Sequence, residues 1–160
     1  MENLYWLAVA TVVIVLFFDY TNGFHDAANI VATIIASRAM TPAQAVVVVG
    51  VFEFLGPLLG GTAVANTIGK FVDLSSLDAP LSVLILFCGL LGAIVWNLAT
   101  WWFGIPSSSS HALVGGLVGS VWCHRVLHDA PAGTALWQVV TSKGVLLTLK
   151  ALVVSPLVGM

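Results

Sequence analysis

The amino-acid sequence predicts an all-α, polytopic membrane protein, and its composition and its tryptophans both point that way. Of the 160 residues, 59% are hydrophobic and 8% are charged, and the mean hydropathy is +1.06. A soluble domain carries about 25% charged residues, so lipid must cover much of this chain. The net charge of −2 provides no basic surface for nucleic acid. Several tryptophans lie at the ends of apolar runs, as an interfacial aromatic belt requires: Trp6, Trp101, Trp102 and Trp122.

The first apolar segment covers residues 4–18, and the apolar pattern resumes over 27–37 after a polar interval. One straight helix across both segments would be about 50 Å long, whereas the hydrocarbon core is about 30 Å thick. Gly23 weakens a helix interior, and Asn22 is a good N-cap for a helix that restarts. The sequence therefore predicts a broken first helix, with the break near Asn22 and Gly23.

The second helix is predicted to start at Thr41 and Pro42, since proline suits a first helical turn. The apolar residues that follow carry one charge, Glu53, and Gly56-Pro57 is expected to interrupt them. Glu53 is an acid inside a membrane segment, which favours a functional role. The alternative is a buried carboxyl group that is hydrogen-bonded to a neighbouring helix.

After the second helix, the sequence predicts a loop over residues 70–80 and a charge-free membrane span over 81–103. Residues 104–106 end that span. A short apolar segment, 111–122, follows four serines, and its length of roughly 12 to 16 residues suits a re-entrant half-helix. Asn97, inside the span, is interpreted as a polar contact between helices.

The C-terminal part is predicted to contain a solvated loop over residues 124–135 and a last helical segment from about residue 139. His124 and His128 are expected to be solvated there rather than to bind a metal. Residues 1–160 are expected to form a single transmembrane domain. The chain stops at Met160 within an apolar run, so we expect a fragment or one half of a larger protein.

The first group of functional residues surrounds the predicted restart at Gly23. A helix that begins there places His25, Asp26 and Asn29 in its first two turns, with Asp26 and Asn29 on one face. A carboxylate, an amide and free backbone N–H groups would then converge at membrane depth. The alternative is that Asp26 caps a helix at the interface, where it favours the helix dipole.

The second group is a row of hydroxyls directly before a helix. The row and the histidine after it are Ser107, Ser108, Ser109, Ser110 and His111. The N–H groups in a first helical turn have no partners inside the helix, and with hydroxyls they form a cradle for an anion. The alternative is a serine-rich loop that supplies one N-cap.

Together the two groups are typical of transporters in which discontinuous helices direct their N-termini at an anionic substrate. A carboxylate beside an anion is repulsive unless something compensates for it. Either Na⁺ binds near Asp26, or the anion carries a proton that it donates to Asp26. Both alternatives predict a symporter, and the second favours phosphate over sulfate. No cofactor other than the coupling ion is expected, and no metal ligand set is certain.

Residues 23–29 and 106–111 resemble the two signatures of the inorganic phosphate transporter (Pit) family. Phe52-Glu53 with Gly56, and residues 143–159, are similar to further stretches of that family. The resemblance implies cotransport of inorganic phosphate with Na⁺ or H⁺ across the cell membrane. It also implies two inverted repeats, each with both signatures, of which this chain matches only the first.

The resemblance further implies that Asp26 and Asn29 contact phosphate or a coupling ion and that Ser108 to Ser110 line the phosphate site. Coupling-ion or gating roles fall to Asn22, His25, Glu53 and His111. Many members have Asn where this chain has His25. The second repeat, or a second copy of the chain in a homodimer, is the expected protein partner within the lipid bilayer.

Two other functions remain open from the sequence. An intramembrane serine hydrolase would use Ser110 with His111 and Asp26, but no G-x-S-x-G pattern surrounds the serine. Adjacent residues on a helix also diverge by about 100°. A non-transporting membrane subunit is the other alternative, and it predicts that changes at Asp26 and Ser109 leave phosphate uptake unchanged.

Overall fold

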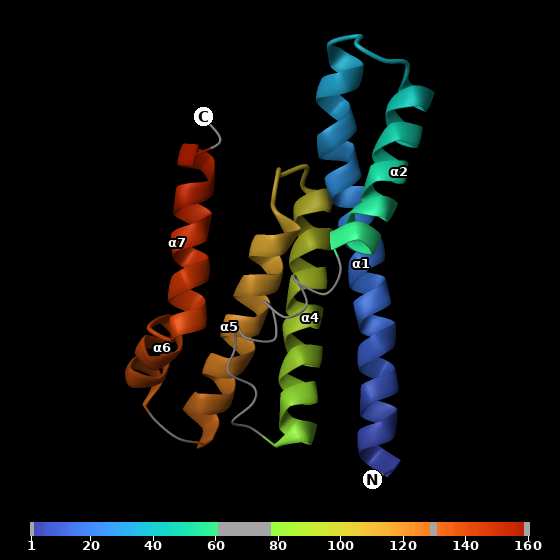
Figure 1. Ribbon diagram of the computed structural model, residues 1–160. Helices are drawn as coiled ribbons and strands as arrows, with labels where there is room; N and C mark the ends of the chain where they lie inside the picture. The colour runs from blue at the N-terminus through green and yellow to red at the C-terminus, as the bar shows by residue number, and fades with distance from the viewer. Residues whose placement is uncertain (1, 61–77, 129–130, 159–160) are drawn as a thin grey trace.

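The computed structural model describes residues 2–60, 78–128 and 131–158, and every regular element within these ranges is an α-helix (Figure 1). The helices are α1 (Glu2–Ala36), α2 (Pro42–Gly60), α4 (Ala79–Trp102), α5 (Ser109–His128), α6 (Ala132–Val140) and α7 (Lys143–Val158). The all-α prediction is confirmed for these residues. The predicted loop over 70–80 lies mostly outside them.

The prediction of a broken first helix is wrong, because α1 continues without interruption through Asn22 and Gly23 for 35 residues. At about 1.5 Å per residue α1 is about 50 Å long. A helical glycine costs only about 1 kcal/mol relative to alanine, and the residues that follow pack on α4. Phe24 meets Trp101 edge to face, with ring centroids 5.5 Å apart. This contact with α4 lies one residue beyond Gly23 and favours a continuous helix there.

The second helix begins as predicted and then continues through its proline. Thr41 and Gln44 form a capping box: the Thr41 N–H donates to Gln44 Oε1 at 3.1 Å, and Thr41 Oγ1 accepts from the Gln44 N–H at 3.4 Å. The interruption predicted at Gly56-Pro57 is wrong, since Pro57 lies inside α2. Its ring removes one backbone donor and leaves the carbonyl of Glu53 without its usual helical partner.

The charge-free span is confirmed as α4, and it ends where the sequence predicted. Gly104 adopts a positive φ of 63°. Its N–H donates to the Trp101 carbonyl at 3.1 Å, and the Ile105 N–H donates to the Thr100 carbonyl at 2.8 Å. This pair of bonds is a Schellman motif, in which glycine adopts the left-handed conformation without a steric cost. Pro106 then prevents the helix from resuming immediately.

The helix after the serines is longer than predicted. α5 has 20 residues rather than roughly 12 to 16, and it includes residues 124–128 of the predicted loop. Residues 132–135 of that loop belong to α6. His124 and His128 are therefore one helical turn apart, with ring centroids separated by 4.8 Å. The last segment begins with α6 and continues, after a turn, as α7.

Three helices pack together and position the site (Figure 1): α1 and α4 run in the same direction, and α5 returns antiparallel to α4. α4 and α5 approach closely because both carry small residues there. A Cβ added at Gly116 would clash with the carbonyl oxygen of Gly89, and a Cβ on Gly92 would lie 3.7 Å from Gly116 Cα. Such small-residue contacts bring helix backbones together in membranes.

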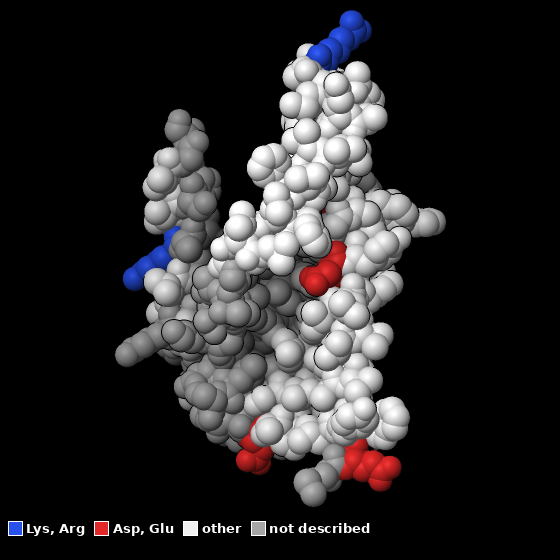
Figure 2. Space-filling view, turned by 45° about the vertical axis from the view of Figure 1, so that its right-hand side comes forward, with Lys and Arg blue, Asp and Glu red and all other residues white. Residues whose placement is uncertain are grey.

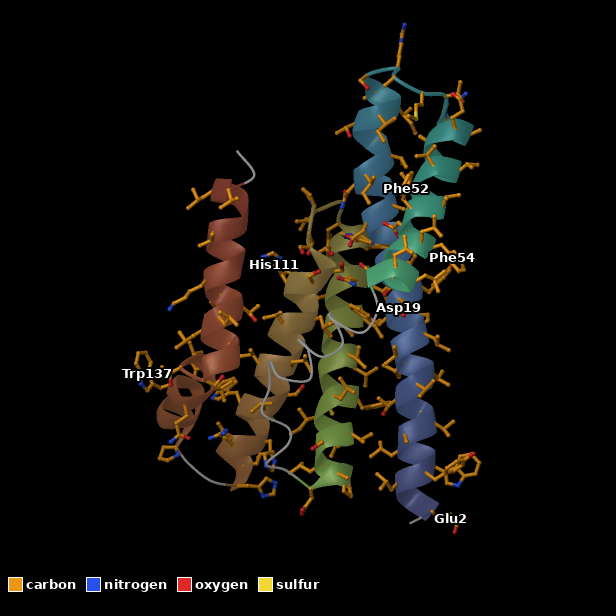
Figure 3. All side chains as sticks on the ribbon, in the orientation of Figure 1. Glu2, Asp19, Phe52, Phe54, His111 and Trp137 are labelled. Atoms are coloured by element: carbon orange, nitrogen blue, oxygen red, sulfur yellow. The ribbon has the colours of Figure 1, made fainter. Side chains whose placement is uncertain are left out.

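The outer surface is apolar, as a lipid-covered protein requires. Phe52, Phe54 and Trp137 are each 70% exposed, and Figure 3 shows them on the outside of α2 and α6. Figure 2 shows a face with few charges: acidic side chains lie at one end and midway along the molecule. Among the described residues, α1, α2 and α4 are long and apolar enough to span a membrane.

Candidate functional site

The first turn of α5 is an open helix N-terminus. Ser108 is its N-cap: the hydroxyl accepts from the His111 N–H at 3.4 Å, and the Ser108 carbonyl accepts from the Ala112 N–H at 3.0 Å. The N–H groups of Ser109 and Ser110 lie before the first helical hydrogen bond, so they have no partner within α5. The predicted start of a helix within the serine row is therefore confirmed.

The Asp26 carboxylate lies directly against this helix start. The hydroxyl of Ser109 donates to Asp26 Oδ2 at 2.7 Å, although 83 residues separate the two along the chain. Ser109 is 3% exposed, and the Asp26 side chain is 33% exposed. A hydrogen bond between a hydroxyl and a carboxylate at this distance is strong. The structure thus joins the two groups that the sequence singled out.

His25 connects Asp26 to α4. Its Nδ1 lies 3.4 Å from Asp26 Oδ1, and its Nε2 lies 3.4 Å from Thr100 Oγ1. The Thr100 hydroxyl donates within its own helix, to the carbonyls of Trp96 at 2.9 Å and Asn97 at 3.1 Å. The Thr100 oxygen is therefore placed to accept a hydrogen bond at His25 Nε2. His25 is buried at 6% exposure, and its ring lies between the Asp26 carboxylate and Thr100 of α4.

Asn29 and Ser107 border the same region without joining the Asp26 contact. Asn29 lines an open hollow of about 330 Å³ together with His25 and the residues that end α4, Gly104 to Pro106. The Ser107 hydroxyl accepts from Trp96 Nε1 at 3.1 Å, which fixes the approach to α5. Ser110 is exposed next to them.

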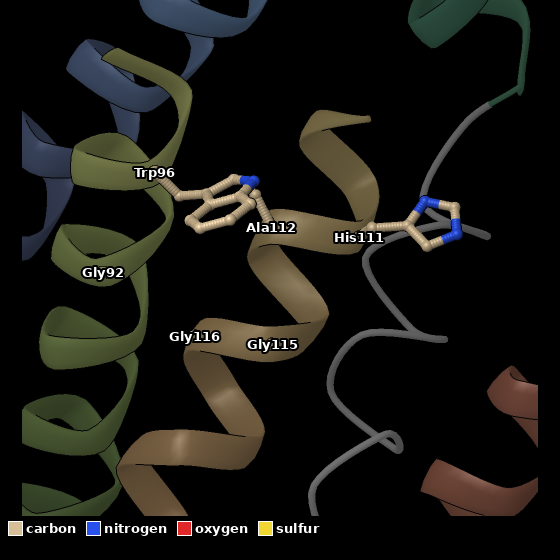
Figure 4. Close-up of a pocket in the computed structure, with 6 residues that line it drawn as sticks. All are labelled: Gly92, Trp96, His111, Ala112, Gly115 and Gly116. Carbon is tan, nitrogen blue, oxygen red and sulfur yellow. The ribbon is translucent and has the colours of Figure 1, made fainter. Parts of the chain in front are cut away.

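The remaining predicted residues lie apart from this contact. Glu53 is exposed on α2. His111 is exposed and, in Figure 4, points away from Trp96 and α4. Asn22 lies one turn before His25 on α1, and its Oδ1 is buried with no hydrogen-bond partner among the described residues. The structure therefore brings together His25, Asp26 and Ser109 most closely.

A second hollow, of about 430 Å³, lies between α4 and α5 beside the serines (Figure 4). Trp96 reaches from α4 toward Ala112, and His111 of α5 and glycines on both helices form the remaining lining. Its walls are mainly apolar. It offers space next to the anion cradle but few polar groups of its own.

Thr100 and Trp96 belong to the site, and the sequence reasoning missed both. Thr100 follows Asn97 by three residues in a segment without charges, so the two share a helix face. Polar residues repeating at this spacing in an apolar helix were the signal that could have found it. Trp96 gave no such signal, because tryptophan is common in membrane segments.

The arrangement favours an anion close to a carboxylate. Free N–H groups, serine hydroxyls and the positive end of α5 attract negative charge, and Asp26 already takes one of those hydroxyls. No group of three or more His, Cys, Asp or Glu among residues 2–60, 78–128 and 131–158 could hold a metal ion. The side chains that meet here are serine hydroxyls, the His25 imidazole and one acid, Asp26.

A serine hydrolase needs a histidine between its serine and its acid. Here Asp26 lies between them: Ser109 contacts one carboxylate oxygen, and His25 lies near the other. This order cannot relay a proton from the serine to the histidine. The arrangement of Ser109, Asp26 and His25 is therefore not that of a catalytic triad.

Comparison with known proteins identifies the family of the chain. The model of the phosphate transporter family matches residues 22–160. A probable low-affinity inorganic phosphate transporter of Streptomyces halstedii is 46% identical over 96% of this chain and 66% of its own length. The corresponding protein of Rhizobium meliloti (strain 1021) is 42% identical, over 96% of this chain and 42% of its own length.

The low-affinity inorganic phosphate transporter PitA of Escherichia coli (strain K12) is 41% identical, over 96% of this chain and 31% of its own length. The chain thus spans less than two thirds of each of these relatives. No solved structure matches it. The family consists of transporters rather than enzymes, and because the described residues include three helices able to cross a bilayer, the chain is a multi-pass membrane protein. Because the family model covers most of its length, the chain belongs to the phosphate transporter family.

Proposed function

We propose that this chain forms part of a carrier that moves inorganic phosphate across the cell membrane together with Na⁺ or H⁺. The hydrogen bond between Ser109 and Asp26 carries the proposal, because it places a carboxylate at the open N-terminus of α5. The names of the relatives, which are inorganic phosphate transporters, support the same substrate.

Phosphate would bind at the donors that Asp26 now faces. A phosphate oxygen can accept from the N–H groups of Ser109 and Ser110 and from the neighbouring hydroxyls, as anions do at helix starts. Asn29, which lines the adjoining hollow, supplies an amide on the same side. Because no Lys or Arg belongs to this group, neutral donors hold the anion and allow its release.

The repulsion between Asp26 and a bound phosphate accounts for the coupling. Two negative charges at contact distance are unfavourable, so one compensating charge must arrive with the substrate. A proton on phosphate could be donated to Asp26, or Na⁺ could bind between them. Either route binds phosphate and the coupling ion together.

The complete carrier requires more helices than these. The relatives are longer than this chain, and we propose that a second, inverted repeat or a second copy of the chain completes the site. In that arrangement α5 serves as a re-entrant helix. The last part of α1 and most of α2 lie beyond the start of α5 (Figure 1), so apolar helices extend to both sides of that start.

The test is phosphate uptake by a chimera in which this chain replaces the matching segment of Escherichia coli PitA. Proteoliposomes containing the chimera should accumulate radiolabelled phosphate when a Na⁺ or H⁺ gradient is imposed. Asp26→Asn removes the negative charge and keeps the shape, so we expect uptake to fall by about tenfold or more.

Ser120→Ala is the matched control, because Ser120 lies on the same helix and its hydroxyl donates to the Gly116 carbonyl at 2.8 Å. This variant should keep the uptake of the unchanged chimera. Equal uptake by the Asp26→Asn and Ser120→Ala chimeras, at equal protein levels, would instead favour a non-transporting subunit.

A further inference from the structure

His124 and His128 continue the buried face of α5 beyond its last apolar contact. They follow Leu117 and Val121 at spacings of four, three and four residues, so the four side chains share one face of the helix. Leu117 and Val121 are buried in the core with Ile85 of α4. His124 is half-buried and His128 is exposed. Two imidazoles therefore lie where the packed face of α5 becomes exposed at the end of the helix.

The helix gives these two histidines a fixed relation to each other. The sequence predicted a loop over residues 124–135, in which two histidines four residues apart have no defined separation. Within α5 the same spacing sets both imidazoles on one face, one turn apart. Pairs of histidines at this helical spacing bind Zn²⁺ in metalloproteases. The structure therefore makes a metal site possible where the sequence alone favoured solvated side chains.

The two rings are separated by the distance that a shared metal ion requires. Their centroids are 4.8 Å apart. A metal ion about 2.0–2.1 Å from an imidazole nitrogen lies about 3.2 Å from the centroid of that ring. Two imidazoles about 90–110° apart around one ion therefore have centroids roughly 4.5–5.2 Å apart. Because χ2 of histidine is a broad torsion, each ring can turn one nitrogen toward the ion.

The charges around the pair permit a cation. The histidines belong to the last turns of α5, where unpaired carbonyl groups give the helix end a partial negative charge. The Arg125 guanidinium donates to Gln138 Oε1 on α6 at 3.0 Å, so its charge is directed at α6. α6 itself carries no charged residue between Ala132 and Val140. Asp78, which precedes α4, lies at the same end of the bundle as the end of α5 (Figure 1).

We propose that His124 and His128 chelate a divalent transition-metal ion of the class that imidazole prefers, such as Zn²⁺ or Cu²⁺, at the C-terminal end of α5. The imidazoles supply two ligands, and water molecules complete the coordination. Ser109 lies fifteen residues earlier on α5, about 22 Å along the helix axis. The metal site is therefore separate from the proposed phosphate site and does not depend on it. A bound ion would join residues one turn apart and stabilise the last turns of α5.

The test is titration of the full chain with Cu²⁺ in nanodiscs of zwitterionic lipid, with affinity tags removed. Cu²⁺ is the divalent first-row ion that nitrogen ligands bind most tightly, and pulsed EPR counts the imidazoles that coordinate it. Cys88 and Cys123 are replaced by serine in every sample, because thiolates favour Cu(I). This parent chain should bind one equivalent of Cu²⁺ tightly, with two imidazoles on the ion.

His128→Ala combined with Val126→His is the matched variant, because it keeps the number of histidines at four. It sets the two histidines of this helix end about 200° apart around α5. Both altered positions are exposed, so the variant should remain folded. The second imidazole of a chelate binds at a high effective concentration. We therefore expect the affinity for Cu²⁺ to fall by about tenfold or more, and the EPR spectrum to show one imidazole.

Ser120→Ala should bind Cu²⁺ as the parent chain does. Equal Cu²⁺ affinity of the parent and of the variant with the moved histidine would overturn the site. A parent chain whose bound Cu²⁺ shows only one imidazole would overturn it as well. Neither result bears on phosphate uptake by the PitA chimera, which tests the carrier proposal separately.

Discussion

The two glycines at which the sequence predicts helix ends behave differently. Gly23 stays inside α1, whereas Gly104 ends α4 with a positive φ of 63°. Gly104 is followed at once by Ile105 and by Pro106, which cannot continue the helix. Gly23 is followed by residues that pack against α4. A glycine thus ends a helix where the following sequence blocks it, and an isolated glycine between packed turns does not.

This difference changes how the site is built. The two groups of residues were predicted to supply two open helix starts, and only the serine row supplies one. The other group supplies side chains from the middle of a continuous helix, with Asp26 reaching Ser109. The site therefore combines the backbone donors of one helix with the acid of another.

The largest expected effect concerns the pairing of α4 and α5, which holds the helix start in place. Gly116→Val would drive a branched side chain into the backbone of Gly89. Backbone cannot move aside as a flexible side chain can, so we expect a loss of about 3 kcal/mol in the free energy of unfolding. Unfolding in mixed detergent micelles measures this loss.

Gly115→Ala serves as the control for Gly116→Val, because nothing lies within 4 Å of a Cβ built at Gly115. It should leave the stability within about 0.5 kcal/mol of the unchanged chain. Equal stability of the two variants would show that α4 and α5 do not approach as closely as described.

Two substitutions with smaller expected effects on the free energy of unfolding compare the two glycines directly. Gly104→Ala places a side chain in the left-handed region and should lower the free energy of unfolding by about 1–2 kcal/mol. Gly23→Ala should raise it by about 1 kcal/mol, because the position is helical and no atom lies within 4 Å of the added Cβ. A loss of stability in both variants would indicate that α1 is broken at Gly23.

The sequence predicted the fold class, the span that became α4 and the helix start in the serine row. These features follow from local composition: an apolar run without charges, glycine before proline, and hydroxyls before an apolar segment. The lengths of α1 and α5 could not be predicted in this way. Contacts with α4 extend α1 past Gly23, and contacts with α6 accompany the extra turns of α5.

The Asp26 contact was anticipated only in outline. The sequence placed the acid and the serines in one site, but it could not specify which serine Asp26 contacts, since that depends on the rotation of α5 about its axis. The hydrogen bond selects Ser109, which is buried, over Ser110, which is exposed. The positions of Thr100 and Asn97 beside α1 depend on how α1 and α4 are aligned, which the sequence does not specify.

The most direct test of the account is disulfide cross-linking between α1 and α5 in a background where Cys88 and Cys123 are replaced by serine. Asp26→Cys with Ser109→Cys should form a bridge readily, because the side chains of these two positions are in contact. Asp26→Cys with Ser110→Cys should bridge much more slowly, and mass spectrometry of the digested chain distinguishes the two products. Rapid bridging with Ser109→Cys is the predicted result. Faster bridging with Ser110→Cys, or none with either, would contradict the joining of Asp26 to the start of α5.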